Sequence, residues 1–559
     1  MGLTPSPTEA WPLAWIALVP LWFIVVRGQS IRSNALSGLI WGIGYHGLAL
    51  FWITGIHPMD WMGVPWLASI AIALFCWIVI TLWGALLVAV WAIGISITQS
   101  IFPSIKFPST KATQQRDINP DINPDINLPN PTQNYFLLTS CLRVLIGTGL
   151  WCAIETLWSM SPLYWSGLSY TQSPHNLIIL HLGQLSGPVT VTAAIVAVNG
   201  LIAESGLTLN KFNVGSFNVG SFNVESDHNN LPYGNAKGKQ HSILLGIAIG
   251  LLISLHFIGW LLYSQPIEQS KDSAINVGII QGNIPNEIKL YSAGWQRAIK
   301  GYTTGYQTLA DQKVDAVLTP ETALPFLWEE QVRNVSSFYS AILDKGVLVW
   351  VGGYGQRGRS LTNSLFTVTG TGETFSRYDK VKLVPLGEYI PFEEFLERLI
   401  DRLSPLDAHL APGKPDQLLE TPFGQAVVGI CYESAFPEQF RYQAAAGGQF
   451  ILTASNNAHY SNTMPAQHHA QDVMRSIETD RWAVRATNTG YSGIVDPHGK
   501  TVWLSGINTY ELHADTIYRR QTQTLYVQWG NWLTPVLLGL GGIGWLVLGW
   551  FGVSVGLAN

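Results

Sequence analysis

The sequence predicts an α-helical membrane bundle joined to a large α/β domain. Only 12% of the 559 residues are charged, 47% are hydrophobic, and 23 are tryptophan. Apolar stretches long enough to cross a bilayer lie at the two ends of the chain, whereas residues 273–525 alternate short β-rich runs with helical stretches. Together these observations indicate membrane spans combined with a water-exposed domain.

About seven spans are expected, six of them within residues 1–263 and one at 532–553. The stretches are 11–27, 34–56, 64–97, 135–158, 177–203, 242–263 and 532–553. The third is long enough for one tilted helix plus an interfacial piece. The first is marginal in length and could instead be a signal peptide, but it lacks a basic region before it, and Arg27 follows it.

The charges of the connecting loops predict the orientation of these spans. Lysine and arginine occur in loops 27–33, 98–134 and 204–241, and neither occurs in loops 57–63 and 159–176. By the positive-inside rule, the first group is cytoplasmic, and residues 264–530 lie outside together with the N-terminus. Loops 98–134 and 204–241 contain short polar repeats, so they are expected to be disordered.

Residues 273–525 read as one α/β domain with a sheet covered on both faces. The expected strands are Ile275–Gln281, Ala316–Thr319, Gly346–Gly352, Ser364–Thr369, Gln425–Cys431, Phe450–Ala454 and Ser492–Val495. Several of them end in polar or charged residues, which is where catalytic groups commonly lie in such sheets.

Three motifs in this domain could carry chemistry. Glu321 follows an apolar run, Lys380 lies in the segment 377–391, and Cys431 ends a strand in the polar half of the chain. A thiol can act as nucleophile, a carboxylate as its general base, and an ammonium as stabiliser of an oxyanion. Each residue also has an ordinary structural interpretation: Cys431 as buried packing, Glu321 as a helix-capping group, and Lys380 as a surface charge.

Other classes of site have little support. Cys76, Cys141 and Cys152 lie in apolar runs, and no CxxC pair or Cys/His ligand spacing occurs. His459, His468 and His469 are close in sequence, but a metal site needs convergent ligands, so we expect no metal. The net charge of −5 provides no basic stripe for nucleic acid.

Taken together, the motifs resemble the nitrilase, or carbon–nitrogen hydrolase, superfamily, and more closely the membrane-bound apolipoprotein N-acyltransferase family. The resemblance covers nearly the whole chain. It rests on Pro12-Leu-Ala-Trp15, Gln281-Gly-Asn-Ile-Pro285, Pro320-Glu-Thr-Ala-Leu-Pro325, Tyr378-Asp-Lys380, Leu383-Val-Pro-Leu-Gly-Glu388, Gly429-Ile-Cys-Tyr-Glu433, Arg485-Ala-Thr-Asn488 and Gly530-Asn-Trp532. It implies an αββα sandwich for residues 273–525.

The resemblance also implies roles for the site residues. Glu321 is the general base, Lys380 stabilises the oxyanion, and Cys431 is the nucleophile. Assisting roles fall to Glu388, to Tyr432 through its backbone N–H, and to Glu433, for which holding a loop is an equal alternative.

The implied reaction is the phospholipid-dependent N-acylation of a diacylglyceryl-cysteine at the N-terminus of apolipoproteins, through a thioester. The resemblance implies no cofactor. It places a monomer in the bacterial cytoplasmic membrane, with its catalytic domain on the outer side. Two alternatives remain: a membrane-tethered amidohydrolase that uses water as second nucleophile, and a catalytically inactive transporter or lipid-binding protein.

The chain departs from the family pattern at several positions. Family members commonly begin with one more helix, which is expected to be missing here or to precede the given start. Leu290 stands where the family has a tryptophan, and the loop 456–461 differs from the family's usual sequence. These changes put the preference for an acyl chain or a lipoprotein in doubt. Segment 386–412, with Phe392 and Phe395, could be an amphipathic membrane arm or a packed helix. Arg143 and Glu155 within one span indicate a polar interior role.

Overall fold

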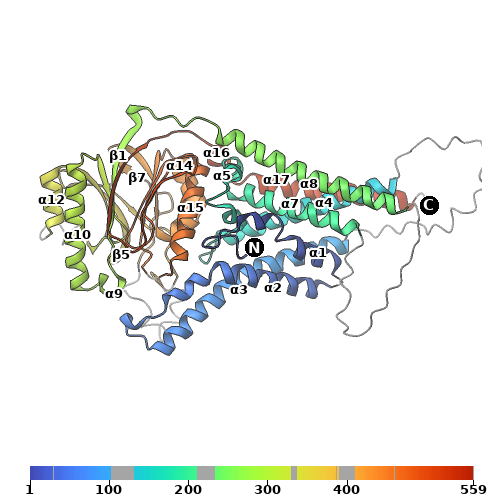
Figure 1. The fold of residues 1–559 in the computed structure, drawn as a ribbon, viewed down its shortest axis with the longest axis horizontal. Coiled ribbons are helices and arrows are strands. Elements are labelled where there is room, and N and C mark those ends of the chain that lie inside the picture. Colours follow the sequence, from blue (N-terminus) through green and yellow to red (C-terminus); the bar gives the residue numbers. More distant parts are fainter. Residues whose placement is uncertain are drawn as a thin grey trace, which may run out of the picture.

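The computed structural model has a bundle of apolar helices at one end and a two-sheet α/β domain at the other (Figure 1). It describes residues 1–28, 30–101, 131–209, 233–328, 336–385, 387–389, 410–458 and 460–557. The predicted arm at Phe392 and Phe395, and His459, lie outside these described residues.

The helical part is built from elements at both ends of the chain. They are η1 (Trp11–Trp15), α1 (Val19–Arg27), α2 (Ile31–Ala49), η2 (Phe51–Ile56), η3 (Asp60–Met62), α3 (Trp66–Ile101), α4 (Pro131–Ser159), η5 (Leu168–Gln172), α5 (Leu177–Leu180), α6 (Gly183–Ser186), α7 (Pro188–Thr208), α8 (Tyr233–Tyr263) and α17 (Leu533–Leu557). Within the described ranges, four helices are long and apolar enough to cross a membrane: Trp66–Gln99, Phe136–Ser159, Pro188–Thr208 and Gly238–Tyr263.

Several predicted stretches differ from the observed helices. Residues 11–27 divide into η1 and α1, because Pro20 begins a new helix at a position that needs no N–H donor. Residues 177–203 break at Gly187, whose φ of 76° leaves the helical region before Pro188 starts α7. The stretch 64–97 is one continuous helix of 36 residues, without a separate interfacial piece.

Two of the three predicted cytoplasmic loops, 98–134 and 204–241, are shorter than expected. Helix α3 continues to Ile101 and α4 already begins at Pro131, while α7 ends at Thr208 and α8 begins at Tyr233. Residues 102–130 and 210–232, which contain the polar repeats, lie outside the described part of the chain.

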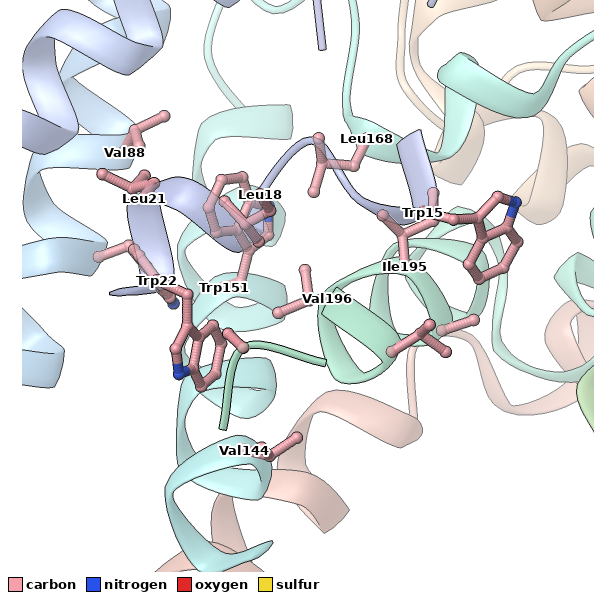
Figure 2. Close-up of a cluster of buried hydrophobic side chains, with 14 of the residues drawn as sticks. Trp15, Leu18, Leu21, Trp22, Val88, Val144, Trp151, Leu168, Ile195 and Val196 are labelled. Atoms are coloured by element: carbon pink, nitrogen blue, oxygen red, sulfur yellow. The ribbon is translucent and has the colours of Figure 1, made fainter. Parts of the chain in front are cut away.

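Trp22 and Trp151 lie among aliphatic side chains in the core of the bundle (Figure 2). Trp22 of α1 lies 5.4 Å from Trp91 of α3, and Trp91 lies 5.3 Å from Trp151 of α4, measured between ring centroids. The two charged residues Arg143 and Glu204 pair inside the bundle, which offsets the cost of burying charge in an apolar medium. Arg143 Nε contacts Glu204 Oε1 at 2.9 Å.

Glu155 has a different function in the fold. Its carboxylate accepts from the backbone N–H of Leu168 at 3.1 Å and from the Thr192 hydroxyl at 2.7 Å. Leu168 begins η5 in the connection that follows α4. The acidic residue that the sequence places inside a span therefore fixes a loop at the end of the bundle near the α/β domain.

The α/β domain contains two sheets. The strands are β1 (Ala274–Gln281), β2 (Ala316–Leu318), β3 (Leu324–Leu327), β4 (Leu348–Arg357), β5 (Ser360–Val368), β6 (Thr374–Asp379), β7 (Leu419–Thr421), β8 (Gly424–Ile430), β9 (Phe450–Ser455), β10 (Ala483–Thr487), β11 (Gly493–Val495), β12 (Thr501–Leu504) and β13 (Glu511–Tyr518). The first sheet has the order β13-β1-β2-β4-β5-β6, with β3 paired to β4, and the second has the order β12-β11-β10-β9-β8-β7.

The two sheets face each other and helices cover both outer faces, so the domain is a nitrilase-like α/β sandwich. Apolar side chains of both sheets, such as Ile279 and Val428, form one buried cluster between them. The helices on the first sheet include α10 (Ser292–Asp311) and α12 (Ser337–Lys345), and those on the second include α14 (Pro437–Ala445) and α15 (Thr463–Thr479). Each predicted β-rich run lies on one of these strands.

Helix α15 lies between the second sheet and the helical bundle (Figure 1). Its residue Gln467 is buried and makes a hydrogen bond at every position that its amide offers. The nitrogen donates to the carbonyls of Ser6 and Ala49 at 2.9 and 2.8 Å, and the oxygen accepts from the indoles of Trp52 and Trp165 at 3.0 and 2.8 Å. One side chain thus binds separate segments of the helical part to the α/β domain.

Candidate active site

Cys431 lies directly after β8, at the start of the short helix η7 (Cys431–Ala435). Its φ of 52° falls in the left-handed region, which is uncommon for a residue with a side chain and costs about 1–3 kcal/mol. The surrounding structure must therefore hold this turn. The Cys431 thiol contacts the carbonyl of Asn456, with 3.8 Å between sulfur and oxygen.

Glu321, Lys380 and Glu388 form one buried ionic cluster. Lys380, which follows β6, donates to Glu321 Oε1 and Glu388 Oε1, both at 2.9 Å. The Asn363 amide on β5 donates to the same two carboxylates at 2.7 and 2.9 Å. Lys380 is only 1% exposed, so these contacts operate with little screening by water.

The cluster fixes the resting protonation states. Burial alone would raise the pKa of the Glu321 carboxyl, but the charge and hydrogen bond of Lys380 outweigh it and lower the pKa below its usual value. Burial would lower the pKa of Lys380, yet Glu321 and Glu388 keep it well above its usual value. Burial and the nearby Glu321 carboxylate raise the pKa of the Cys431 thiol to about 12. At neutral pH the site therefore holds a thiol, an ionised base and an ammonium.

Glu433 lies behind the site and does not touch Lys380 through its carboxylate. One carboxylate oxygen accepts from the backbone N–H groups of Val381 and Lys382, at 2.6 and 3.0 Å. The other accepts from the N–H of Ile430 at 2.7 Å. Glu433 therefore joins the backbone just after Lys380 to the backbone just before Cys431, and the geometry favours the loop-holding alternative for this residue.

Tyr432 connects the strand end to the helical part. Its ring stacks on Trp165 with 6.1 Å between centroids and 6° between planes. Its hydroxyl donates to the carbonyls of Pro162 and Tyr164, at 2.5 and 3.0 Å. The residue after Cys431 is thus anchored on the loop between α4 and η5.

His468 holds the other side of the same turn, which sequence reasoning did not foresee. Its Nε2 lies 2.7 Å from the carbonyl oxygen of Cys431, so this nitrogen carries the hydrogen and donates it. Its Nδ1 faces the Arg485 guanidinium at 3.3 Å, which requires Nδ1 to be the acceptor. Burial, with Arg485 beside it, keeps the pKa of His468 well below its usual value. A neutral ring therefore supports the left-handed turn at Cys431.

The motifs Gln281–Pro285 and Arg485–Asn488 contact each other next to the site. Asn283, with a φ of 48°, donates its N–H to the Asn488 carbonyl at 2.7 Å. The Asn488 side chain accepts from the N–H of Ile284 at 2.9 Å and donates to Asn456 Oδ1 at 3.0 Å. Asn488 thus ties the segment after β1 to the loop whose carbonyl at Asn456 contacts the thiol.

A cavity of about 330 Å³ opens onto these groups. Glu321, Lys380, Glu388 and Cys431 line its polar wall. A mostly apolar part of the lining comes from η2, η3, α3 and the connections between them: Ile53, Ile56, Met59, Trp61, Met62, Ile72 and Cys76. The site is therefore a polar centre reached along an apolar surface of the helical part.

Lys289 also lines this cavity, and sequence reasoning missed it. The residue ends the short helix α9 (Asn286–Lys289), and only 5% of it is exposed. Its ammonium donates to the backbone carbonyl of Glu321 at 3.1 Å. The only available sequence signal was its position shortly after the Gln281–Pro285 motif.

The histidines do not form a metal site in the described part of the chain. His469 contacts the Thr501 hydroxyl at 2.9 Å, and the His468 ring is engaged as above. Across the described ranges, no group of three or more His, Cys, Asp or Glu is placed to hold a metal ion.

The fold and the site together define the class. A two-sheet sandwich that carries a strand-end cysteine beside a glutamate and a lysine is the arrangement of a carbon–nitrogen hydrolase. The model of the family described as "Carbon-nitrogen hydrolase" matches residues 276–523, and that of the "Apolipoprotein N-acyltransferase N-terminal domain" matches residues 1–109.

Relatives along the whole chain define the family. The chain is 56% identical to the apolipoprotein N-acyltransferase of Nostoc sp., over 98% of this chain and 97% of that protein. It is 48% identical to the apolipoprotein N-acyltransferase of Synechocystis sp., over 98% of each. The chain belongs to the apolipoprotein N-acyltransferase family and is an enzyme of the membrane.

Proposed function

We propose that this enzyme moves an acyl group from a phospholipid to the α-amine of the diacylglyceryl-cysteine at the N-terminus of apolipoproteins, through a thioester on Cys431. The observation that carries the mechanism is the convergence of Cys431, Glu321 and Lys380 on a cavity with an apolar wall from the helical part. Full-length likeness to two apolipoprotein N-acyltransferases supports the acyl transfer and the acceptor.

The first half-reaction forms the thioester. Because the Cys431 thiol is protonated at rest and Glu321 is ionised, Glu321 takes the thiol proton as the sulfur attacks the ester carbonyl. Lys380 and the backbone N–H of Tyr432 stabilise the oxyanion. The oxyanion collapses, the carbon–oxygen ester bond breaks, and the lysophospholipid leaves with the proton held by Glu321.

The ionic cluster lets Lys380 stabilise the oxyanion once Glu321 is protonated. At rest its ammonium is shared between Glu321 and Glu388. When Glu321 becomes neutral, Glu388 remains the only carboxylate bound to Lys380 within the described residues, so more of the ammonium's field acts on the new oxyanion. Glu388 keeps Lys380 in place, and the carboxylate of Glu433 positions both strand ends.

The second half-reaction forms the amide. The neutral α-amine attacks the thioester carbonyl, Glu321 accepts the amine proton, and Cys431 leaves as a thiolate. Glu321 then returns the proton to the sulfur, which restores the resting thiol. An amide replaces the more reactive thioester, so this step is downhill.

The placement in the membrane follows from charge and geometry. The bundle and α17 would contribute about seven spans, with residues 1–263 and 532–553 in the membrane and 273–525 as the catalytic domain. The loops without lysine or arginine, 57–63 and 159–176, flank the α/β domain through contacts such as that between Trp165 and Tyr432. By the positive-inside rule this end is the outer side of the cytoplasmic membrane. We expect the enzyme to act as a monomer.

Mass spectrometry of Cys431 provides the test. The purified full chain, incubated with a phospholipid, should gain one fatty acyl group on Cys431, and a diacylglyceryl-cysteine peptide should then remove it as an N-acyl product. The Cys431→Ala variant should do neither and should fail to restore lipoprotein N-acylation in cells that lack it. Release of free fatty acid at the same rate with and without the peptide would instead indicate a membrane-tethered amidohydrolase.

A further inference from the structure

Lys289 is a buried cation in the active-site cavity that the reaction scheme above does not use. It lines the cavity together with Cys431 and Glu321, and only 5% of it is exposed. An ammonium in such a place loses most of its hydration and needs a compensating partner. The partner it has is the neutral carbonyl of Glu321, at 3.1 Å.

The two lysines of the cavity differ in their carboxylate partners. Lys380 binds two carboxylates, Glu321 and Glu388, at 2.9 Å each. Within the described residues, no carboxylate lies within ion-pair distance of Lys289. Burial lowers the pKa of Lys289 to about 8, although the charge of the Glu321 carboxylate opposes this. An incompletely paired ammonium that faces a substrate cavity is suited to an anionic group of the substrate.

Only one substrate of the proposed function carries a suitable anion near its reacting atom. A phospholipid donor has a phosphodiester attached to the same glycerol unit as its ester. The acceptor presents an amine there, which a lysine would repel. Resting on the proposed function, we propose that Lys289 binds the phosphate of the donor phospholipid while the donor's ester carbonyl lies at Cys431. Lysine binds phosphate as a compact point charge.

The contact between Lys289 and phosphate would affect binding of the donor and not binding of the acceptor. The phosphate leaves with the lysophospholipid, so Lys289 contacts the donor in the first half-reaction and nothing anionic in the second. The subsite therefore favours phosphatidyl donors over uncharged glycerides and leaves aminolysis of the thioester unaffected.

The test separates the two half-reactions and the two kinds of donor. The full chain in detergent micelles is mixed with dipalmitoyl phosphatidylethanolamine or with dipalmitoylglycerol, and thioester on Cys431 is measured in the first turnover. Losing one charge-assisted contact should lower kcat/KM for the phosphatidyl donor by about 10- to 100-fold in Lys289→Met. The rate with dipalmitoylglycerol and the rate of aminolysis should not change. Lys289→Arg should retain most of the preference.

Lys300→Met is the matched control, since Lys300 is exposed on α10, and it should behave as wild type. Equal losses on both donors in Lys289→Met would overturn the inference, because they would show that Lys289 acts only by holding the Glu321 carbonyl. If Lys289→Met does not fold, the wild-type enzyme decides: it must prefer the phosphatidyl donor, and equal rates would refute the subsite. No thioester from either donor in wild type would refute the proposed function itself.

Discussion

Glu433→Gln tests whether Glu433 positions the catalytic residues or transfers a proton. The carboxylate is fully buried, and its two oxygens accept from three backbone N–H groups, those of Val381, Lys382 and Ile430. A glutamine side chain has one acceptor oxygen, and its NH₂ group must face one set of these donors. At least one buried N–H therefore loses its acceptor, whichever way the amide turns.

The expected loss of stability follows from the number of backbone N–H groups that lose their acceptor. A buried donor without an acceptor costs about 1–3 kcal/mol, so Glu433→Gln should lower the free energy of unfolding by about that amount. Because Glu433 does not line the cavity, the KM for donor should stay unchanged. The turn at Cys431 and the segment after Lys380 should both shift, and misplacement on the order of 1 Å lowers kcat about 100-fold.

Denaturant unfolding in detergent and first-turnover kinetics measure the two effects. Glu420→Gln is the matched control, since Glu420 is exposed on β7 and accepts one bond from Gln425 at 2.8 Å, so we expect a change below about 0.5 kcal/mol. Normal stability in Glu433→Gln together with the loss of only one half-reaction would refute the positioning role and indicate direct proton transfer.

Three further predictions concern the base, its loop and the docking of the two parts. Glu321→Gln should lower the pKa of the Cys431 thiol from about 12, because it removes the carboxylate that raises this pKa and frees Lys380. Iodoacetamide should then label Cys431 faster at neutral pH, although acyl transfer is lost. Slower labelling would contradict this prediction. Gly352→Ala should abolish acyl transfer, because a Cβ at this position would lie 2.0 Å from the Pro320 carbonyl oxygen and displace Glu321. The control Gly301→Ala should keep its acyl-transfer activity, because a Cβ there has its nearest neighbour at 3.5 Å. Gln467→Leu leaves its four buried partners without their bonds, so limited proteolysis should cut the connection between the two parts faster than in wild type, and unchanged resistance would refute its docking role.

The sequence was informative where residues follow strands. Glu321 lies shortly after the predicted run 316–319, and Cys431 ends the predicted run 425–431. In the structure Glu321 and Lys380 follow β2 and β6 of the first sheet, and Cys431 follows β8 of the second. Local pattern singled out each residue separately, and only the family likeness predicted that the three share one site. Glu388 and Glu433 were also placed near the site, but their separate contacts depend on loop geometry that no periodicity encodes.

Residues whose role depends on long-range packing could not be predicted. Lys289 reaches the cavity only because the short helix α9 packs against the Glu321 loop. Gln467 looked like any polar residue of an amphipathic helix, yet it binds segments about 300 to 460 positions away in the chain. Breaks in the apolar stretches, such as the one at Gly187, were hidden for a related reason: hydropathy averages over a window that spans the turn.

The contacts around Cys431 join the turn at this residue to the helical bundle. The strained turn at Cys431 is supported on one side by His468 and on the other by Tyr432, and both rings contact Trp165 of the helical part. The backbone that supplies the proposed oxyanion donor is therefore held by a membrane-side loop. A domain separated from that loop would lose the support for the turn. The same packing therefore positions the thiol and brings it to the apolar residues along which we propose that lipid enters.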